Sequence, residues 1–165
     1  MNETAGCRSR KGDLLGLLGF LAGCLVVSGM GGAVTATSVA SWYPELAKPP
    51  FTPPDGVFPP VWTVLFVFMA VAGWRIWRLA EGEDRTVALN WFGVQLVLNL
   101  LWSVIFFGLQ APGWALAEVL LLLGAVAATL RAFLRLDLWA GAALVPYLLW
   151  LGFAAGLNAS IWWLN

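Results

Sequence analysis

Residues 140–164 read AGAALVPYLLWLGFAAGLNASIWWL, a stretch of 25 residues without a charged side chain. A helix needs about 20 mainly apolar residues to cross the hydrocarbon core of a membrane. Four further stretches are also strongly apolar, at residues 14–36, 57–79, 87–109 and 114–134. The sequence therefore predicts an all-α membrane protein, a single bundle of five transmembrane helices with little chain left for another domain.

The overall composition points to the same environment. Of the 165 residues, 61% are hydrophobic and only 11% are charged, about half the charged fraction of an average soluble domain. The nine cationic and nine anionic side chains cancel, so no basic field would attract nucleic acid. The chain has no histidine, the commonest general base and metal ligand. We therefore expect the lipid bilayer as a partner, and no nucleic acid.

The cationic side chains are divided unevenly between the two sides of a five-span protein. Cytoplasmic connections of membrane proteins carry an excess of lysine and arginine. Lys48 alone falls on the side of the carboxy terminus, and the other eight fall on the opposite side: Arg8, Arg10, Lys11, Arg75, Arg78, Arg85, Arg131 and Arg135. We therefore expect a cytoplasmic amino terminus and an external carboxy terminus. This bias, with no transit peptide evident, favours a bacterial source.

The first apolar stretch has a second interpretation. Residues 21–24, LAGC, follow three cationic residues as in a bacterial lipoprotein signal, and residues 38–40, SVA, are similar to an ordinary signal-cleavage site. Cleavage would leave four spans. The apolar run continues well past Cys24, as a membrane span does, and this favours the uncleaved five-span protein.

Glycines in the same stretch have the spacing that lets helices approach closely. The pairs Gly12/Gly16 and Gly19/Gly23 are each four residues apart. Packing within the chain is the favoured interpretation, and a contact between two copies is the alternative.

The eleven tryptophans divide by their place in the predicted spans. Three lie deeper in the spans, at Trp62, Trp102 and Trp150. The others lie near span ends, where aromatic belts meet the membrane interface: Trp42, Trp74, Trp77, Trp91, Trp114, Trp139, Trp162 and Trp163.

A proline-rich segment joins the first two spans. Residues 42–62 read WYPELAKPPFTPPDGVFPPVW and contain seven prolines, which fix φ and lack an amide donor. Pro53 and Pro54, followed by Asp-Gly, predict a turn. Two interpretations stay open: a stiff lid over a pocket, which would include Trp42, Lys48, Pro53 and Pro54, or a linker with interfacial aromatic residues.

Polar and aromatic side chains share helix faces in the third and fifth spans. Gln95, Asn99 and Trp102 stand at i, i+4 and i+7, and the same kind of spacing relates Trp150, Ala154 and Leu157. Amides that face lipid are costly, so these faces should point into the bundle. From spacing alone, contacts between packed helices are favoured over a ligand pocket.

Three stretches match one family pattern in order. Residues 42–62 follow W-Y-x-x-L-x-K-P-x-x-x-P-P-x-x-x-F-x-x-x-W, and residues 95–107 follow Q-L-x-L-N-x-x-W-x-x-x-F-F. Residues 146–150 and 157–158 supply P-Y-x-x-W and L-N. Together they resemble the TspO family, also called the translocator protein or peripheral benzodiazepine receptor family. The sequence departs from the family at Phe51, where many members have tryptophan.

The resemblance implies a receptor or sensor that binds porphyrins, such as protoporphyrin IX, or other flat apolar ligands such as sterols in an intramembrane aromatic pocket. It implies no required cofactor, and it makes a homodimer an expectation. Some family members degrade porphyrin in light with aromatic residues that match Trp62 and Trp150, so such an enzyme is an alternative, as is a transporter of tetrapyrroles or sterols. Residues at the following positions line or border the family's ligand cavity: Tyr43, Trp62, Asn99, Trp102, Trp150, Ala154 and Leu157.

Two charged side chains have competing interpretations. Lys48, the one cation expected on the external side, is either a partner for porphyrin carboxylates or an ordinary interfacial lysine. Glu118 is the one acid within a predicted span, where it could carry protons in a transporter. It lies about one turn from the start of that span, so stabilisation of the helix amino terminus is the favoured interpretation.

Overall fold

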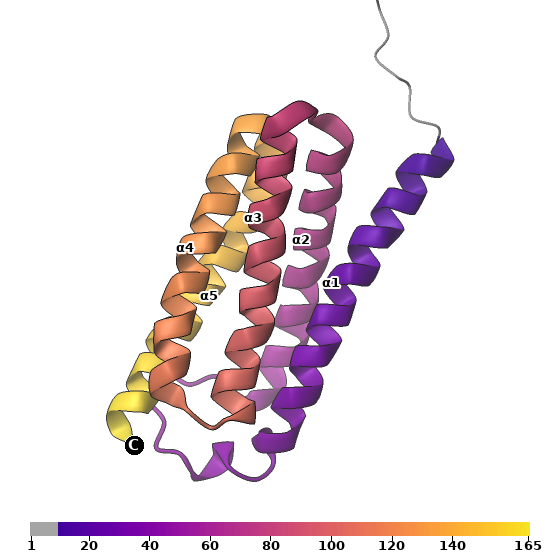
Figure 1. The fold of residues 1–165 in the computed structure, drawn as a ribbon. Coiled ribbons are helices and arrows are strands. Elements are labelled where there is room, and N and C mark those ends of the chain that lie inside the picture. Colours follow the sequence, from indigo (N-terminus) through magenta and orange to yellow (C-terminus); the bar gives the residue numbers. More distant parts are fainter. Residues whose placement is uncertain (1–9) are drawn as a thin grey trace, which may run out of the picture.

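The computed structural model describes residues 10–165, and these form five long helices, with a loop of residues 40–57 after the first and shorter connections after the others. The helices run lengthwise beside one another (Figure 1). All five are long and apolar enough to cross a membrane, as the sequence predicted. Their bounds are α1 Arg10–Val39, α2 Phe58–Leu79, α3 Gly82–Ser103, α4 Pro112–Leu136 and α5 Leu138–Leu164. Arg8, counted among the cations above, lies outside the described residues.

The third predicted span differs most from the structure. It was expected as one regular helix over residues 87–109, but α3 ends at Ser103 and continues as a π-helical turn, η3 Val104–Gly108. Its start also lies earlier, at Gly82, where a φ of +68° suits glycine because it has no Cβ. The early start leaves only two residues between α2 and α3, so these helices are joined by a tight turn.

The helices differ in how they take part in the bundle. α4 packs extensively against both α3 and α5, whereas α1 packs against α2 and, towards its carboxy-terminal end, against α3 and η3. Figure 1 shows α1 leaning away from the other helices towards its amino-terminal end. Only Cys24, Gly31 and Ser38 of α1 are buried. Cys24 contributes to the core from within an unbroken helix, as a residue of a membrane span does.

The glycines of α1 play two different parts. Gly16 lies so close to the Trp77 ring that a Cβ would collide with it, so this glycine packs within the chain as expected. Gly19 and Gly23 have open space beside them, so the same expectation is wrong for that pair. Their side of α1 faces away from the bundle.

Ion pairs join the helices at the end opposite to the α1–α2 connection. Asp137 precedes α5, and its Oδ1 accepts hydrogen bonds from the Ala140 amide at 2.6 Å and Arg75 Nε at 2.9 Å. Its Oδ2 accepts from Arg75 Nη2 at 2.8 Å. The bonds from Arg75 are the main reason that the pKa of Asp137 lies below its usual value. At the same end Arg78 lies 3.4 Å from a carboxylate oxygen of Asp13 on α1.

The tryptophans assigned to interfacial belts do not all face outward. Trp114, Trp139 and Trp163 are highly exposed, as a belt requires. Trp77 instead packs on Gly16, and the Trp74 indole donates a hydrogen bond to the backbone carbonyl of residue 13 at 3.0 Å. The second group therefore holds α1 against α2.

Candidate ligand-binding cavity

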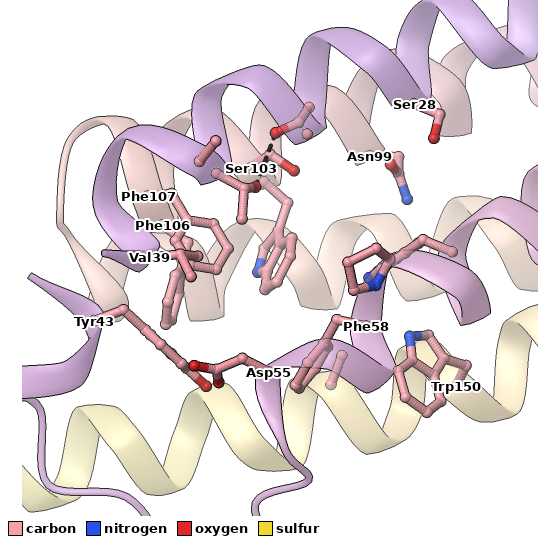
Figure 2. Close-up of a pocket in the computed structure, with 18 of the residues that line it drawn as sticks. Ser28, Val39, Tyr43, Asp55, Phe58, Asn99, Ser103, Phe106, Phe107 and Trp150 are labelled. Atoms are coloured by element: carbon pink, nitrogen blue, oxygen red, sulfur yellow. Dashed lines mark hydrogen bonds between the residues drawn. The ribbon is translucent and has the colours of Figure 1, made fainter. Parts of the chain in front are cut away.

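A cavity of about 480 Å³ lies between α1, α2, α3 and α5, at the end that carries the α1–α2 connection. Small-molecule sites commonly occupy about 300–1,000 Å³ and are mostly apolar. The α1 wall is built from small side chains, which include Gly31, Gly32 and Ala36. The facing walls from α2, α3 and α5 are aromatic (Figure 2). This combination leaves room for a flat molecule against a set of rings.

The seven residues that the resemblance singled out all lie on the wall of this cavity, although they come from four different parts of the chain. They are Tyr43 before α2, Trp62 on α2, Asn99 and Trp102 on α3, and Trp150, Ala154 and Leu157 on α5. The fold thus brings together what the sequence separates by more than 100 residues. Contact of these residues with a ligand stays a prediction.

Trp150 supplies an unused hydrogen-bond donor. Its ring meets Phe58 edge-on at a centroid distance of 5.9 Å, which fixes the indole between α5 and the start of α2. Its Nε1 is buried and has no hydrogen-bond partner among the described residues. A buried donor without a partner is costly, so a ligand acceptor at this point would be stabilised.

The polar groups of Asn99 and Trp102 are engaged in the packing of the bundle. Asn99 Nδ2 donates to the buried Tyr147 hydroxyl at 2.9 Å. Trp102 Nε1 donates to Asn158 Oδ1 at 3.1 Å, and Asn158 Nδ2 donates to the Pro112 carbonyl at 2.8 Å. These bonds tie α3, α5 and the start of α4 together. Trp102 therefore offers its ring face to the cavity, with its indole hydrogen already used.

Gln95 shares the inward face of α3 but does not reach the cavity wall. It is buried, as the spacing predicted, and neither its amide nitrogen nor its amide oxygen has a partner among the described residues.

The π-helical turn η3 forms the end of the α3 wall. It presents Phe106 and Phe107 to the cavity, and Phe106 stacks on Trp102 with ring centroids 5.4 Å apart. The Ser38 hydroxyl on α1 donates to the Phe107 carbonyl at 2.6 Å, which satisfies a carbonyl at the irregular helix end. π-helical turns are frequent at functional sites. Nothing in the apolar pattern of this span signalled the turn.

The loop between α1 and α2, residues 40–57, closes one end of the cavity. Tyr43, in the short helix η1 Tyr43–Glu45, is only 5% exposed and packs against the rings of Phe106 and Phe107. Asp55 starts a second short helix, η2 Asp55–Val57, and also lines the cavity. Figure 2 shows the Tyr43 hydroxyl pointing towards the Asp55 carboxylate. Burial, and then the Asp55 charge, raise the pKa of Tyr43.

The other loop residues predicted as parts of a lid do not line this cavity. Trp42 packs edge-on against Phe106 from outside the wall. Pro53 and Pro54 precede η2 without lining the cavity. Lys48 Nζ lies 4.5 Å from the centroid of the Tyr43 ring and does not reach the wall. The structure therefore gives no support to Lys48 as a direct partner of ligand carboxylates.

The loop is fastened to the last helix by Asn165, a residue that sequence reasoning missed. Asn165 Oδ1 accepts a hydrogen bond from the Ala47 amide at 3.0 Å, and its Nδ2 donates to the Ala47 carbonyl at 3.0 Å. The same Nδ2 donates to the Ile161 carbonyl at 2.8 Å. A contact between residues 118 positions apart leaves no signal in local sequence.

Glu118 lies away from the cavity, and its favoured interpretation is wrong. It is the seventh residue of α4, and the first turn of that helix contains no acidic residue. The stabilising effect of a helix amino terminus fades beyond that turn. Glu118 is instead 5% exposed, and neither carboxylate oxygen has a hydrogen-bond partner among residues 10–165.

Comparison with known proteins finds similarity over most of the chain. The TspO/MBR family model matches residues 20–164. The chain is 41% identical over 150 residues to the tryptophan-rich protein TspO of Chlorobaculum tepidum, which covers 86% of this chain and 90% of that protein. It is 44% identical over 124 residues to the tryptophan-rich sensory protein of Cereibacter sphaeroides, with coverage of 75% and 77%. To the translocator protein of Homo sapiens it is 41% identical over 123 residues, 73% of each chain.

Proposed function

The chain belongs to the TspO/MBR family of multi-pass membrane proteins, and we propose that it is a sensor or receptor that binds a porphyrin or another flat apolar ligand in the cavity between α1, α2, α3 and α5. Two of its relatives are named as a tryptophan-rich sensory protein and a translocator protein. Family membership supports the general role, and the chemistry of the cavity is the argument for the ligand.

One observation carries the proposal: an aromatic wall on three helices encloses a buried indole donor that has no hydrogen-bond partner among residues 10–165. Trp62, Trp102 and Trp150 line one cavity, and Trp150 Nε1 is the unpartnered group. Stacking on such rings stabilises a flat conjugated molecule without requiring charge, and the indole donor would fix its orientation. A porphyrin has the required flatness and large apolar faces.

The direction of access follows from the proposed orientation. The cations of the described residues other than Lys48 lie at the end opposite to the loop, so that end is proposed to be cytoplasmic. The loop and the cavity beneath it would then face the external side. The ligand would enter from outside or from the outer half of the bilayer.

A light-dependent porphyrin-degrading enzyme is the second candidate. It is favoured by the presence of both Trp62 and Trp150 on the cavity wall, because aromatic chemistry on a bound porphyrin needs rings next to it. The Trp62 ring also meets the Tyr147 ring at 6.2 Å, so a second oxidisable ring adjoins the first.

The test is a titration of the detergent-purified protein with protoporphyrin IX in the dark. Tryptophan fluorescence and the porphyrin absorbance are both followed, because Trp150 itself contributes to the fluorescence. We expect saturable binding that Trp150→Phe weakens by about two- to tenfold, the range for the loss of one hydrogen bond. Trp163→Phe, at an 85% exposed position outside the cavity, is the matched control and should bind like the wild type.

The outcomes separate the candidates. Linear quenching that is indifferent to Trp150 would remove the proposed ligand class. Illumination of the saturated sample then tests the second candidate: bleaching of bound porphyrin that is lost in Trp62→Phe would support the enzyme, and stable porphyrin spectra would argue against it.

A further inference from the structure

The charge at the loop end of the cavity is opposite to the charge that a porphyrin dicarboxylate requires. Among the described residues that line the cavity, Asp55 is the one with a formal charge. Its carboxylate makes no ion pair with any cation of residues 10–165. Figure 2 shows it beside the Tyr43 hydroxyl and the Phe58 ring, at the end where the loop meets the cavity.

The cation in this loop compensates only in part. Lys48 Nζ lies over the Tyr43 ring at 4.5 Å, outside the cavity wall. Glu45, in the same loop, is an acid that does not line the cavity. With two acids and one base, the loop has a net charge of −1. The polar end of a ligand bound at this end of the cavity therefore lies next to the Asp55 carboxylate, whereas the Lys48 ammonium group lies outside the wall.

We propose that Asp55 is a specificity-determining residue, which makes the cavity prefer ligands whose polar end is neutral or cationic over ligands that end in free carboxylates. The inference rests on the proposed function and narrows its ligand class. An alcohol or an amine can donate a hydrogen bond to the Asp55 carboxylate, and an ester can lie beside it without the repulsion of a second charge. A second carboxylate at that point adds a like charge, which costs free energy.

The size of the effect follows from the exposure of Asp55. It is solvent-exposed at the start of η2, so water and salt screen its charge. Interactions between exposed charges change an equilibrium by about one- to fivefold. Selectivity against free carboxylates should therefore be modest and should depend on salt. The apolar interior of the cavity should not contribute to it.

The experiment compares protoporphyrin IX with its dimethyl ester, which has the same ring and no free carboxylate. Dissociation constants are measured for the wild type and Asp55→Asn at about 20 mM and about 500 mM salt, where the Debye length falls severalfold. At low salt we expect Asp55→Asn to tighten binding of the diacid by about two- to fivefold and to leave the diester unchanged. At high salt the difference between the two proteins should largely vanish.

Glu45→Gln is the matched control, because it removes the same charge from the same loop at a position outside the cavity. It should leave the diacid-to-diester ratio as in the wild type. The inference is overturned if Asp55→Asn leaves that ratio unchanged, if it weakens the diacid, or if Glu45→Gln has the same effect. Saturable binding of both porphyrins with a diacid-to-diester ratio that does not respond to Asp55→Asn would defeat the inference alone, whereas no binding of either porphyrin would defeat the proposed function as well.

Discussion

Replacing Asn165 with alanine should loosen the loop that closes the cavity and speed the release of the ligand. The Asn165 carboxamide makes two hydrogen bonds with the backbone of Ala47, each 3.0 Å long. Ala47 lies in the loop between Tyr43 and Asp55, the loop residues that line the cavity. Loss of the carboxamide therefore removes the direct bonds between this part of the loop and α5.

The expected magnitude is limited because these bonds are exposed to solvent. A net hydrogen bond contributes about 0.5–1.5 kcal/mol, and exposed bonds fall at the low end. Two of them together give about 1 kcal/mol, which corresponds to a roughly fivefold shift of the loop towards its open form. If the ligand leaves through the open form, its dissociation rate should rise by about the same factor.

The assay is stopped-flow displacement of bound protoporphyrin IX, followed by its fluorescence. Ser160→Ala is the matched control, because among the described residues the Ser160 hydroxyl donates only to the Gly156 carbonyl of its own helix and does not reach the loop. The reasoning is refuted if Asn165→Ala releases the porphyrin at the wild-type rate, or if Ser160→Ala accelerates release equally.

Two further predictions concern charged side chains outside the cavity. Asp137→Asn should destabilise the protein at neutral pH by about 1–3 kcal/mol, because it removes the charge that pairs with Arg75, whereas asparagine can still accept the capping hydrogen bond from the Ala140 amide. Since the folded state lowers the pKa of Asp137, that stability is present at pH values above about 4 and is lost as the pH falls through the folded-state pKa. The melting temperatures of the wild type and Asp137→Asn should therefore converge in acid. A difference in melting temperature that stays constant with pH would contradict this. Glu118→Gln should leave porphyrin flux into proteoliposomes unchanged and raise the melting temperature by about 2–4 °C, since it removes a buried ionisable group that has no hydrogen-bond partner among the described residues. Lost flux would instead make Glu118 a coupling residue, and a lower melting temperature would reveal a partner for its carboxylate.

Features that depend on a single helix were predictable from the sequence. The positions of the spans follow from the apolar length that lipid requires, and this requirement acts on each helix separately. The burial of Gln95 and Asn99 follows equally from helical spacing and the cost of an amide in lipid. The residues of the cavity came from family resemblance, because spacing alone favoured helix packing for the same positions.

Features that depend on two distant segments were not predictable. The π-helical turn at Phe106 and Phe107 interrupts a run that is as apolar as a regular membrane-spanning helix. The hydroxyl that donates to its Phe107 carbonyl belongs to Ser38, which lies on another helix. The Asn165 bonds and the cavity position of Asp55 likewise require knowledge of where the loop lies. Gly19 and Gly23 have the same spacing as a packed pair, but the rotation of α1 turns them outward.

The two sides of the cavity differ in how firmly they are held, and this difference bears on how a sensor of this fold can respond. The aromatic side is fixed by hydrogen bonds between helices, from Asn99 to Tyr147 and from Trp102 through Asn158. The α1 side has few buried residues, and at this end its side-chain hydrogen bond to another helix is that of Ser38. Ligand binding can change an equilibrium only where two arrangements have similar free energies. α1, which buries few residues, and its loop meet that condition better than α3 and α5, so a signal from the occupied cavity is expected to leave through movement of α1 and the loop.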